Sequence, residues 1–282
     1  MARIIDGKAI AAAVRGEIKE NTRKLLAETG VKPGLAVIIV GENPASQVYV
    51  RNKKKACEEV GFYSEVHELP EATTQAELNA LVDALNDNEK IHGILVQLPL
   101  PKHLDETEVL LRIRPEKDVD AFHPYNVGKI MIGDPDFLPC TPAGVMALLE
   151  RSNIEVAGKR CVVIGRSNIV GKPMAMLLLH ANGTVTICHS RTANLAEVCR
   201  EADILVVAIG RADFVGADMV KPGAVVIDVG MNRRADGKLT GDVDFDAVEP
   251  IASAITPVPG GVGPMTITML LQNTLTAAKK KA

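Results

Sequence analysis

One stretch, residues 160–173, constrains the fold of this chain more than any other. It reads Arg-Cys-Val-Val-Ile-Gly-Arg-Ser-Asn-Ile-Val-Gly-Lys-Pro. The apolar run at residues 161–164 predicts a buried strand that stops at Gly165. Apolar residues then recur at helical spacing, at Ile169, Val170, Met174, Leu177 and Leu178. A strand, a glycine turn and a helix in succession place free backbone N–H groups at the strand's carboxyl end, where a phosphate can bind.

The glycines of this stretch depart from the usual dinucleotide-binding spacing, Gly-x-Gly-x-x-Gly. Ser167 stands where the second glycine is usual, and Gly171 follows one residue later than the pattern asks. Gly171 predicts a close approach of the helix to the sheet. A glycine turn between a strand and a helix is also common in ordinary loops, so this stretch alone does not establish a nucleotide site.

The next predicted strand, residues 184–189, adds information about the cofactor. It ends in Ser190-Arg191-Thr192. An NAD site places an Asp or Glu here for the ribose 2′-hydroxyl, whereas a cation and a hydroxyl suit a 2′-phosphate. We therefore expect an NADP site that includes Gly165 and Ser167, with Arg166, Ser190 and Arg191 near the 2′-phosphate. The alternatives are an NAD site and two arginines that are only solvated.

Length and composition describe an ordinary globular protein with room for two cores. The chain has 282 residues, of which 47% are hydrophobic and 24% charged. A net charge of −3 and 3% aromatic residues argue against a nucleic-acid binder. Five cysteines without a Cys-x-x-Cys pair, and histidines without ligand spacing, predict neither a metal site nor a disulfide framework. Without a signal core or a membrane-spanning run, we expect a cytoplasmic protein.

Alternating strand and helix patterns predict an α/β fold in two domains. Strands are expected at residues 35–40, 64–69 and 93–97, and in the second half at 161–164, 184–189, 203–209 and 224–229. Helices are expected at 8–28, 44–60, 75–85, 143–151 and 265–279. We expect residues 1–140 with 264–282 to form one domain, residues 141–263 to form a Rossmann-like NADP-binding domain, and a cleft to lie between them.

Several polar residues are expected near strand ends of the first domain. Tyr49 and Lys53 lie four apart on one helix face, and Gln97 ends a strand because the following Leu-Pro-Leu-Pro cannot continue it. Asp118 and Asp120 follow in a loop near the same edge, where open α/β sheets place their ligands. The plainer interpretation is a solvated lysine, a packing tyrosine, a strand-end glutamine and two turn aspartates.

Six motifs in this order resemble the bifunctional methylenetetrahydrofolate dehydrogenase/cyclohydrolase family. They are Tyr49-x-x-x-Lys53, Val96-Gln-Leu-Pro-Leu100, Glu116-Lys-Asp-Val-Asp120, Pro139-Cys-Thr-Pro142, Gly165-Arg-Ser-Asn-Ile-Val-Gly171 and Thr256-Pro-Val-Pro-Gly-Gly-Val-Gly-Pro-Met-Thr266. The resemblance extends from about Ile5 to Thr276. Ala121 is a departure, since the family usually has Gly there, and we expect the turn beside Asp120 to be slightly altered.

The resemblance implies two successive reactions in the expected cleft. First, 5,10-methylenetetrahydrofolate loses a hydride to NADP⁺ and becomes 5,10-methenyltetrahydrofolate. Water then opens this cation to 10-formyltetrahydrofolate. The resemblance also implies a homodimer that associates through the nucleotide-binding domains, and a contact between Met231 and the nicotinamide.

The resemblance assigns the hydrolytic step to Lys53. This step takes a proton from water and delivers one to a folate nitrogen, so it needs a group that holds either protonation state. We hypothesise that burial and the substrate's charge lower the pKa of Lys53. Gln97 is expected to bond the amine without adding charge, and Tyr49 to lie along the flat substrate.

The remaining substrate contacts are expected from Asp120 and the glycine-rich loop. Asp120 is expected to accept two N–H groups of the pterin, and Pro259 and Gly260 to approach the flat ligand closely. Two other functions stay open. One is a dehydrogenase that has lost the hydrolytic step, against which the presence of Lys53 and Gln97 argues. The other is a catalytically silent NADP-binding sensor.

Overall fold

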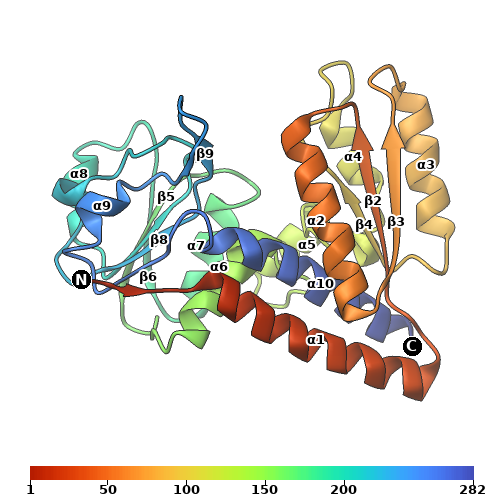
Figure 1. Cartoon of the computed structure of the whole chain (residues 1–282), viewed down its shortest axis with the longest axis horizontal. Helices are drawn as coiled ribbons and strands as arrows, with labels where there is room; N and C mark the ends of the chain where they lie inside the picture. Colours follow the sequence, from red (N-terminus) through yellow and green to blue (C-terminus); the bar gives the residue numbers. More distant parts are fainter. The chain divides into compact units, whose positions relative to one another are not determined.

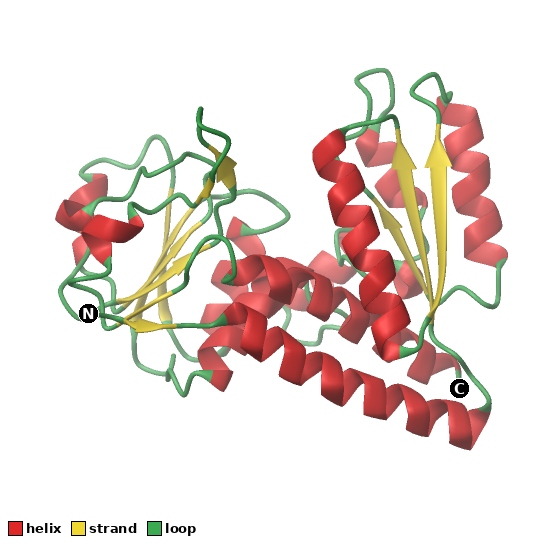
Figure 2. Ribbon diagram, viewed as in Figure 1, coloured by secondary structure: helices red, strands yellow, loops and turns green.

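The computed structural model of the protein describes residues 1–282, except for the side chain of Ala45 (Figure 1). The chain divides into two compact units. Unit 1 contains residues 1–12 and 141–266, and unit 2 contains residues 13–140 and 267–282. Both units combine helices with a parallel sheet, which confirms the predicted α/β class (Figure 2).

The sheet of unit 2 has three parallel strands in the order β3-β2-β4. They are β2 (Gly34–Val40), β3 (Tyr63–Leu69) and β4 (Gly93–Val96). The helical segments of this unit are α2 (Pro44–Val60), α3 (Gln75–Asp87), α4 (Glu106–Arg112), η1 (Pro115–Lys117) and α5 (Pro124–Met131). Two long helices, α1 (Gly7–Thr29) and α10 (Val262–Lys281), contribute most of their residues to unit 2.

Both faces of β2 are covered. All seven of its residues are buried, as predicted for a central strand. Ala36 and Ile38 share a core cluster with Leu78 and Val82 of α3. The alternate side chains point to the other face, because the side-chain period of a strand is two, and α2 contacts β2 and β3. Strand β2 therefore offers only its ends to a ligand.

The C-terminal helix α10 returns to unit 2, as the sequence predicted. Asn273 on this helix donates from Nδ2 to the backbone oxygens of Val119 and Leu138, each at 2.8 Å. Thr274 lies beside Gly93 of β4, where an added Cβ would come within 3.2 Å of its hydroxyl oxygen. The helix thus supports the loop that carries Asp120.

The sheet of unit 1 has six parallel strands in the order β1-β11-β8-β7-β5-β6. They are β1 (Arg3–Ile4), β5 (Arg160–Ile164), β6 (Thr184–Cys188), β7 (Ile204–Val207), β8 (Val225–Asp228) and β11 (Ala254–Ile255). Helical segments are α6 (Cys140–Arg151), α7 (Gly171–His180), α8 (Leu195–Arg200), η2 (Ala217–Met219) and α9 (Phe245–Val248). The parallel order confirms the Rossmann-like character of this part of the chain.

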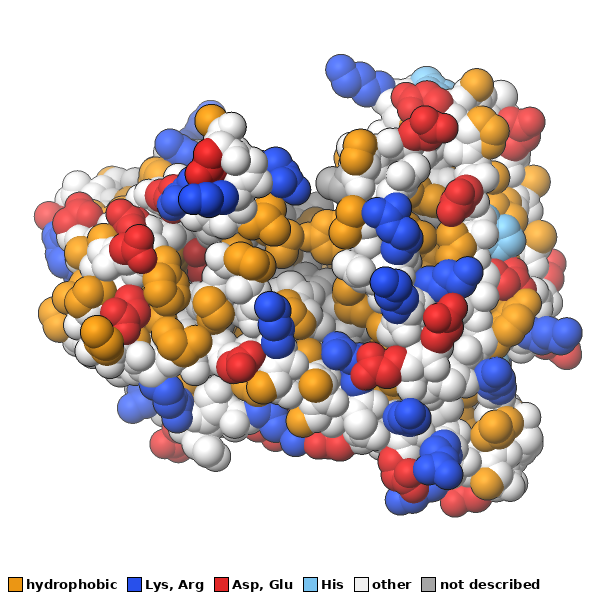
Figure 3. Space-filling model, in the orientation of Figure 1, with side chains coloured by type: hydrophobic (Ala, Val, Ile, Leu, Met, Phe, Trp, Pro, Cys, Tyr) orange, Lys and Arg blue, Asp and Glu red, His pale blue; other side chains and the backbone are white. Residues whose placement is uncertain are grey.

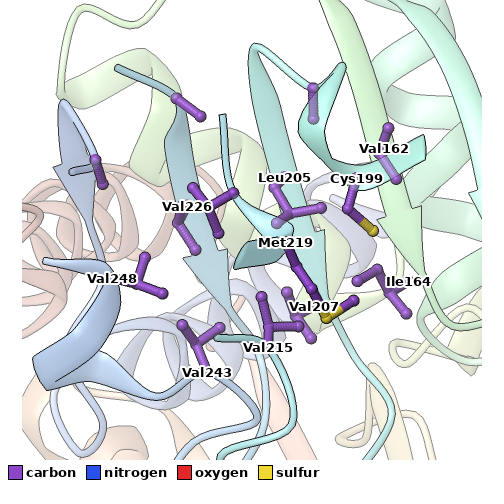
Figure 4. Packing of buried hydrophobic residues seen from close by; sticks show 14 of the residues in the cluster. Val162, Ile164, Cys199, Leu205, Val207, Val215, Met219, Val226, Val243 and Val248 are labelled. Carbon is purple, nitrogen blue, oxygen red and sulfur yellow. The ribbon is translucent and has the colours of Figure 1, made fainter. Parts of the chain in front are cut away.

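An apolar cluster packs against one face of the unit 1 sheet (Figure 4). Strands β5, β7 and β8 contribute Val162, Ile164, Leu205, Val207 and Val226. Segments that follow the strands cover this face with Val215, Met219, Val243 and Val248. Because the cluster joins strand residues to the segments that follow β7 and β8, it holds those segments against the sheet.

The first residues of the chain belong to unit 1, although the sequence pattern grouped residues 1–140 together. Strand β1 pairs in parallel with β11, with Arg3 opposite Ala254 and Ile4 opposite Ile255. Two-residue strands carry too little apolar pattern to be predicted. The antiparallel pair β9 (Asn232–Arg233) and β10 (Leu239–Thr240) was missed for the same reason. The assignment of folate and NADP to separate domains stays a prediction.

Helix α7 begins later than the apolar pattern suggested. Ile169 is 42% exposed and precedes the helix, which starts at Gly171. The Ser167 hydroxyl accepts hydrogen bonds from the backbone N–H groups of Val170 and Gly171, at 3.1 and 3.2 Å, and so closes the turn before the helix. The predicted close approach at Gly171 is confirmed, because an added Cβ would lie 2.2 Å from the backbone oxygen of Gly165.

The surface carries charges of both signs. On the face in Figure 3, Lys and Arg side chains are interspersed with Asp and Glu side chains. Exposed ion pairs of the described residues include Arg112 with Asp83 and Arg160 with Glu201. Such pairs contribute little to stability in water. Among the described residues, no helix has both the length and the apolar character that a membrane crossing requires.

We predict that Gly171→Ala lowers the free energy of unfolding by about 1–3 kcal/mol, because the new methyl group must displace the backbone at Gly165. Gly16→Ala is the matched control, since no atom lies within 4 Å of its added Cβ in helix α1. This control is expected to raise stability by about 0.5–1 kcal/mol. Urea unfolding followed by circular dichroism measures both changes. An unchanged midpoint for Gly171→Ala would contradict the close approach.

Candidate functional site

The carboxyl edge of the unit 2 sheet brings Lys53 and Gln97 together. Lys53 lies on α2, the helix that follows β2, and Gln97 comes directly after β4. The Gln97 backbone N–H donates to the Ile38 oxygen at 2.8 Å, which holds its backbone against β2. The Lys53 amine donates from Nζ to Gln97 Oε1 at 2.9 Å. The expected pairing of these two side chains is therefore present.

The amide of Gln97 has a defined orientation. Its Nε2 group donates to the backbone oxygen of Leu98 at 2.8 Å. This bond identifies the other amide atom, Oε1, as the acceptor that faces Lys53. The amine thus has a neutral partner, and the partner adds no charge to the site.

Lys53 is buried, in contrast to its neighbours on the same helix. It is 8% exposed, whereas Lys54 and Lys55 are exposed. The interpretation of Lys53 as a solvated surface lysine is therefore wrong. Burial lowers the pKa of Lys53, and the negative charge of Asp120 opposes this shift. A lowered pKa raises the fraction of neutral amine near neutral pH.

Asp120 lies close to Lys53, at the end of a loop fixed against β4. An isolated parallel bridge between Ile94 and Asp118 holds this loop. Loss of solvent raises the pKa of Asp120, while the charge of Lys53 and a hydrogen bond from the Cys140 thiol lower it. Cys140 Sγ is also 3.4 Å from the Val119 oxygen. No signal in the sequence places this thiol beside the carboxylate.

Asp118 organises the loop rather than facing the amine. Its carboxylate accepts from the His123 backbone N–H at 2.8 Å and from Asn126 Nδ2 at 2.9 Å. His123 in turn accepts from the Tyr125 backbone N–H through Nδ1, at the start of α5. The structural interpretation of Asp118 and His123 thus fits their contacts.

Ala121 adopts a backbone conformation that favours glycine. Its φ is 58°, and its side chain is completely buried. For an L-residue this left-handed region is unfavourable, but a methyl group is the smallest side chain that can occupy it. The turn after Asp120 therefore keeps the shape that a glycine would allow, with a buried methyl group in addition.

Tyr49 lies one helical turn before Lys53. Its side chain is 36% exposed, and loss of solvent raises the pKa of its phenol. The phenol therefore stays neutral at physiological pH. An aromatic ring that is partly open to solvent and one turn from the buried amine can cover a flat ligand.

The carboxyl edge of the unit 1 sheet contains a cavity of about 320 Å³, which we call the β5–β7 cavity. Its lining includes Gly165, Arg166 and Ser190, all three of which the sequence assigned to the cofactor. The other lining residues are Ile164, His189, Leu195, Ala208, Ile209, Arg211 and Phe214. The predicted residues Ser167, Arg191 and Met231 are not among the described residues that line this cavity.

Arg191 lies on the same turn as Ser190. The Arg191 backbone N–H donates to His189 Nδ1 at 3.1 Å, and the His189 backbone N–H donates to the Thr192 hydroxyl at 2.9 Å. These bonds fix the turn after β6 and leave the Arg191 side chain exposed. Its guanidinium is therefore solvated next to the cavity.

Gly165 has no room for a side chain. Its φ is 132°, and an added Cβ would lie 2.3 Å from the Ala208 oxygen. Ser167 uses its oxygen to cap the turn before α7, but its hydroxyl proton can still be donated to a ligand. The turn thus has a small cross-section at Gly165 and a hydroxyl donor at Ser167, both of which suit a pyrophosphate.

Met231 and the glycine-rich loop form a separate group in unit 1. Met231 follows β8 and is 42% exposed, and its methyl carbon would lie 3.1 Å from a Cβ at Gly263. Pro259 precedes Gly260, whose φ of 110° is accessible mainly to glycine. The side chain of Lys8 lies over Gly260, 3.3 Å from the position of an added Cβ.

Two buried carboxylates that the sequence did not single out hold the loops of this edge. Asp242 accepts from the backbone N–H groups of Ile209, Gly210 and Arg211 at 2.7–2.9 Å. Asp228 accepts from three further backbone N–H groups, those of Gly230, Asp242 and Val243. Burial raises the pKa of Asp228 to about 6, although these three bonds oppose the shift.

Metal-ligating and disulfide chemistry have no visible basis among the described residues. They contain no group of three or more His, Cys, Asp or Glu side chains that could hold a metal ion. The five cysteines are unpaired and buried, and burial raises the pKa of each thiol. These thiols are therefore protonated at neutral pH.

Comparisons with known proteins match the whole chain. The family model "Tetrahydrofolate dehydrogenase/cyclohydrolase, catalytic domain" matches residues 5–120, and "Tetrahydrofolate dehydrogenase/cyclohydrolase, NAD(P)-binding domain" matches residues 139–282. The Bifunctional protein FolD of Acetivibrio thermocellus is 60% identical over 281 residues, which cover 100% of this chain and 98% of the relative. That of Moorella thermoacetica is 63% identical over 279 residues, which cover 99% of both chains.

Solved structures agree with this result. The bifunctional FolD dehydrogenase/cyclohydrolase of Campylobacter jejuni has a TM-score of 0.97 and 52% identity, with 100% of both chains covered. The Trypanosoma brucei dehydrogenase-cyclohydrolase, solved with NADP cofactor and an inhibitor, has a TM-score of 0.95 and 45% identity, with 99% of this chain and 98% of that chain covered. The chain belongs to the tetrahydrofolate dehydrogenase/cyclohydrolase family.

Proposed function

We propose that this protein oxidises 5,10-methylenetetrahydrofolate with NADP⁺ to 5,10-methenyltetrahydrofolate and then hydrolyses it to 10-formyltetrahydrofolate, in one-carbon folate metabolism. The observation that carries the proposal is the buried Lys53 amine, hydrogen-bonded to the neutral Gln97 amide at 2.9 Å, in a chain of this family. A buried amine with a lowered pKa is suited to exchange protons near neutral pH.

The residues at the carboxyl edge of unit 1 fit NADP. The Gly165 turn accepts the pyrophosphate, because the backbone has no room for a side chain there and the positive end of the α7 dipole follows it. Arg166, Ser190 and Arg191 supply two cations and a hydroxyl for the 2′-phosphate, and Ser167 supplies a further hydroxyl. NADP⁺ supplies the hydride acceptor of the first reaction.

The oxidation needs positioning more than acid or base catalysis. Loss of a hydride from the methylene carbon leaves a cation that two nitrogen atoms stabilise, so no side chain has to gain or lose a proton in this step. Met231 and the Pro259-Gly260 segment lie in one group at the carboxyl edge of unit 1. In the proposed complex, Met231 contacts the nicotinamide and the glycine-rich loop contacts the folate.

The hydrolysis is assigned to Lys53. Water adds to the methenyl carbon while the neutral amine of Lys53 takes one of its protons, and the bond from that carbon to one folate nitrogen then breaks as Lys53 returns the proton to that nitrogen. The formyl C=O forms as the remaining hydroxyl proton leaves to solvent, so the reaction releases one proton and the positive charge of the substrate is lost. Gln97 holds the amine in place. The positive substrate lowers the pKa of Lys53 further, since two like charges repel.

Asp120 and Tyr49 bind the pterin in this mechanism. The Asp120 carboxylate faces two parallel N–H donors of the ring, which strengthens both hydrogen bonds. The electrostatic interaction between Asp120 and Lys53 supports a role for both residues at one folate molecule. Tyr49 lies along the flat face of the substrate.

The proposal extends to domain roles, assembly and location. Residues 1–140 with 264–282 bind folate, apart from the N-terminal segment that packs with the other unit, and residues 141–263 bind NADP. The protein works in the cytoplasm as a homodimer joined through its NADP-binding domains. Strand β6 supports this assembly, because it is the last strand of its sheet and Ile187 on it is 37% exposed.

One assay separates the candidate functions. Purified protein receives 5,10-methylenetetrahydrofolate and NADP⁺, and the absorbance of reduced cofactor and of methenyltetrahydrofolate are followed together. Reduction without accumulation of the methenyl compound indicates both reactions. Reduction with accumulation indicates a dehydrogenase alone, and no reduction indicates a silent binding protein.

We predict that Lys53→Met slows methenyltetrahydrofolate hydrolysis by about 10²–10⁴-fold, the usual contribution of a positioned acid–base group. NADP⁺ affinity should stay nearly unchanged, because no residue of the NADP site contacts this amine in the proposal. Lys54→Met is the matched control, since Lys54 is exposed on the same helix. Hydrolysis at the normal rate in Lys53→Met would refute the assignment.

The pH dependence of hydrolysis tests the state of Lys53. The neutral amine is the active form, so the rate rises with pH through the pKa of Lys53, which burial places below the ordinary lysine value. Gln97→Glu puts a carboxylate against the amine, raises its pKa and moves the rise to higher pH. Rates of single-turnover hydrolysis across the pH range, corrected with Lys53→Met, give both profiles. A shift to lower pH would contradict the model.

We predict that Arg191→Ala weakens NADP⁺ binding about 10–100-fold and NAD⁺ binding much less, because a charged hydrogen bond to the 2′-phosphate is lost. Titration of each cofactor into the folate-free protein measures both affinities. Equal losses for the two cofactors would show that Arg191 does not recognise the 2′-phosphate.

A further inference from the structure

One arginine that lines the β5–β7 cavity has no role in the proposed mechanism. Arg211 lines the cavity together with Phe214, on the loop that follows β7. Its guanidinium carbon lies 4.5 Å from the centre of the Phe214 ring. The ring therefore supports one side of the guanidinium group.

Arg211 is not engaged by an acidic side chain. Among the ion pairs between described residues, none involves Arg211, whereas Arg160, Arg112 and Arg234 in comparable exposure each pair with a carboxylate. The side chain is exposed. A flat cation that is stacked on one side and unpaired on the other can bind a second flat ring.

The backbone of this loop is held firmly. The Arg211 N–H donates to the buried Asp242 carboxylate at 2.8 Å, and the N–H groups of Ile209 and Gly210 donate to the same carboxylate. Phe214 is followed by Val215, which is buried in the core cluster of unit 1 (Figure 4). Both members of the stacked pair are thus anchored to the folded core.

The remaining walls of the cavity suit an aromatic base. Ile164, Leu195 and Ile209 supply apolar surface. Gly165 and Ser190, at which the proposed function places the pyrophosphate and the ribose 2′-phosphate, line the same cavity. The part of NADP attached to that ribose is the adenine ring, so it is the part that reaches this space.

We propose that Arg211 is a further cofactor-binding residue of this chain, whose guanidinium stacks between Phe214 and the adenine ring of the bound NADP. The proposal rests on the proposed NADP site and adds a base-recognition residue to it. In this arrangement Arg211 recognises the flat base, whereas Arg166 and Arg191 recognise the 2′-phosphate.

The test is cofactor binding by the folate-free protein. Stacking on one base predicts that Arg211→Ala weakens NADP⁺ and NAD⁺ by the same factor, about tenfold, because both contain adenine. The binding of adenosine 2′,5′-bisphosphate to Arg211→Ala should weaken by the same factor, and the binding of nicotinamide mononucleotide should not change. A larger loss for NADP⁺ than for NAD⁺, or no loss, would overturn the proposal. The first result would make Arg211 a phosphate contact.

Two further variants distinguish stacking from charge. Arg211→Lys keeps the charge but loses the flat guanidinium group, so this variant should bind NADP⁺ at least about threefold more weakly than the wild type does. Phe214→Leu should weaken binding by about threefold, and the Arg211→Ala/Phe214→Leu double variant should be no weaker than Arg211→Ala, since the ring acts through the guanidinium. If the double variant lost affinity by the product of the two single losses, the stack would be contradicted. Wild-type affinity in Arg211→Lys would contradict it as well.

The controls separate this proposal from the proposed function. Arg160→Ala removes an exposed arginine at the amino end of β5 and should leave cofactor binding unchanged. Arg211→Ala should keep the wild-type kcat at saturating NADP⁺ while its KM for NADP⁺ rises about tenfold. A wild-type protein that binds the adenine fragments normally but reduces no NADP⁺ would refute the enzyme function and leave the adenine site intact.

Discussion

The chemistry proposed for this chain depends on one hydrogen bond inside unit 2, from the Lys53 amine to the Gln97 amide. Burial of an ammonium group is costly, and a carboxylate partner would repay that cost by keeping the group charged. Gln97 offers only a dipole, so the amine is positioned without being fixed as a cation. Burial lowers the pKa of Lys53, and the negative charge of Asp120 raises it. The site therefore lowers the pKa of Lys53 through burial, while the charge of Asp120 limits the shift.

Unit 1 solves a different problem with carboxylates. In the proposed function its loops face a polyanion, and their backbone N–H groups need internal partners that keep the loops in place. Asp228 and Asp242 are such partners and accept six backbone N–H groups below the surface, three each. The glycines at these positions leave room for the carboxylates, since an added Cβ at Gly230 or Gly241 would overlap them. Buried acids thus fix the loops while the cations at the surface remain free for the ligand.

The sequence predicts much of this architecture because the relevant signals are local. The apolar run of β2 and the glycine turn after β5 each identify their element within a few residues. The proximity of Lys53 and Gln97 can be predicted in part, since one residue lies on the helix after β2 and the other directly follows β4 at the same sheet edge. Strand β1 was not predictable, because two residues paired with β11 some 250 positions later have no periodicity to detect. The late start of α7 was hidden by Ile169 and Val170, which continue the apolar pattern through a turn that Ser167 closes.

Arg211 shows why part of the site could not be found from the sequence. Arg166 and Arg191 follow strand ends at which the dinucleotide-binding pattern predicts phosphate contacts, so both can be predicted as cofactor-binding residues. The segment Ile209-Gly210-Arg211 has the same form, a strand end, a glycine and a cation, but no known spacing connects it to a phosphate. The proposed role of Arg211 depends on tertiary contacts, because Asp242 from a distant segment fixes the backbone and Phe214 supports the guanidinium. A cation that stacks on a base requires a fixed plane more than it requires charge, and planes are set by tertiary contacts.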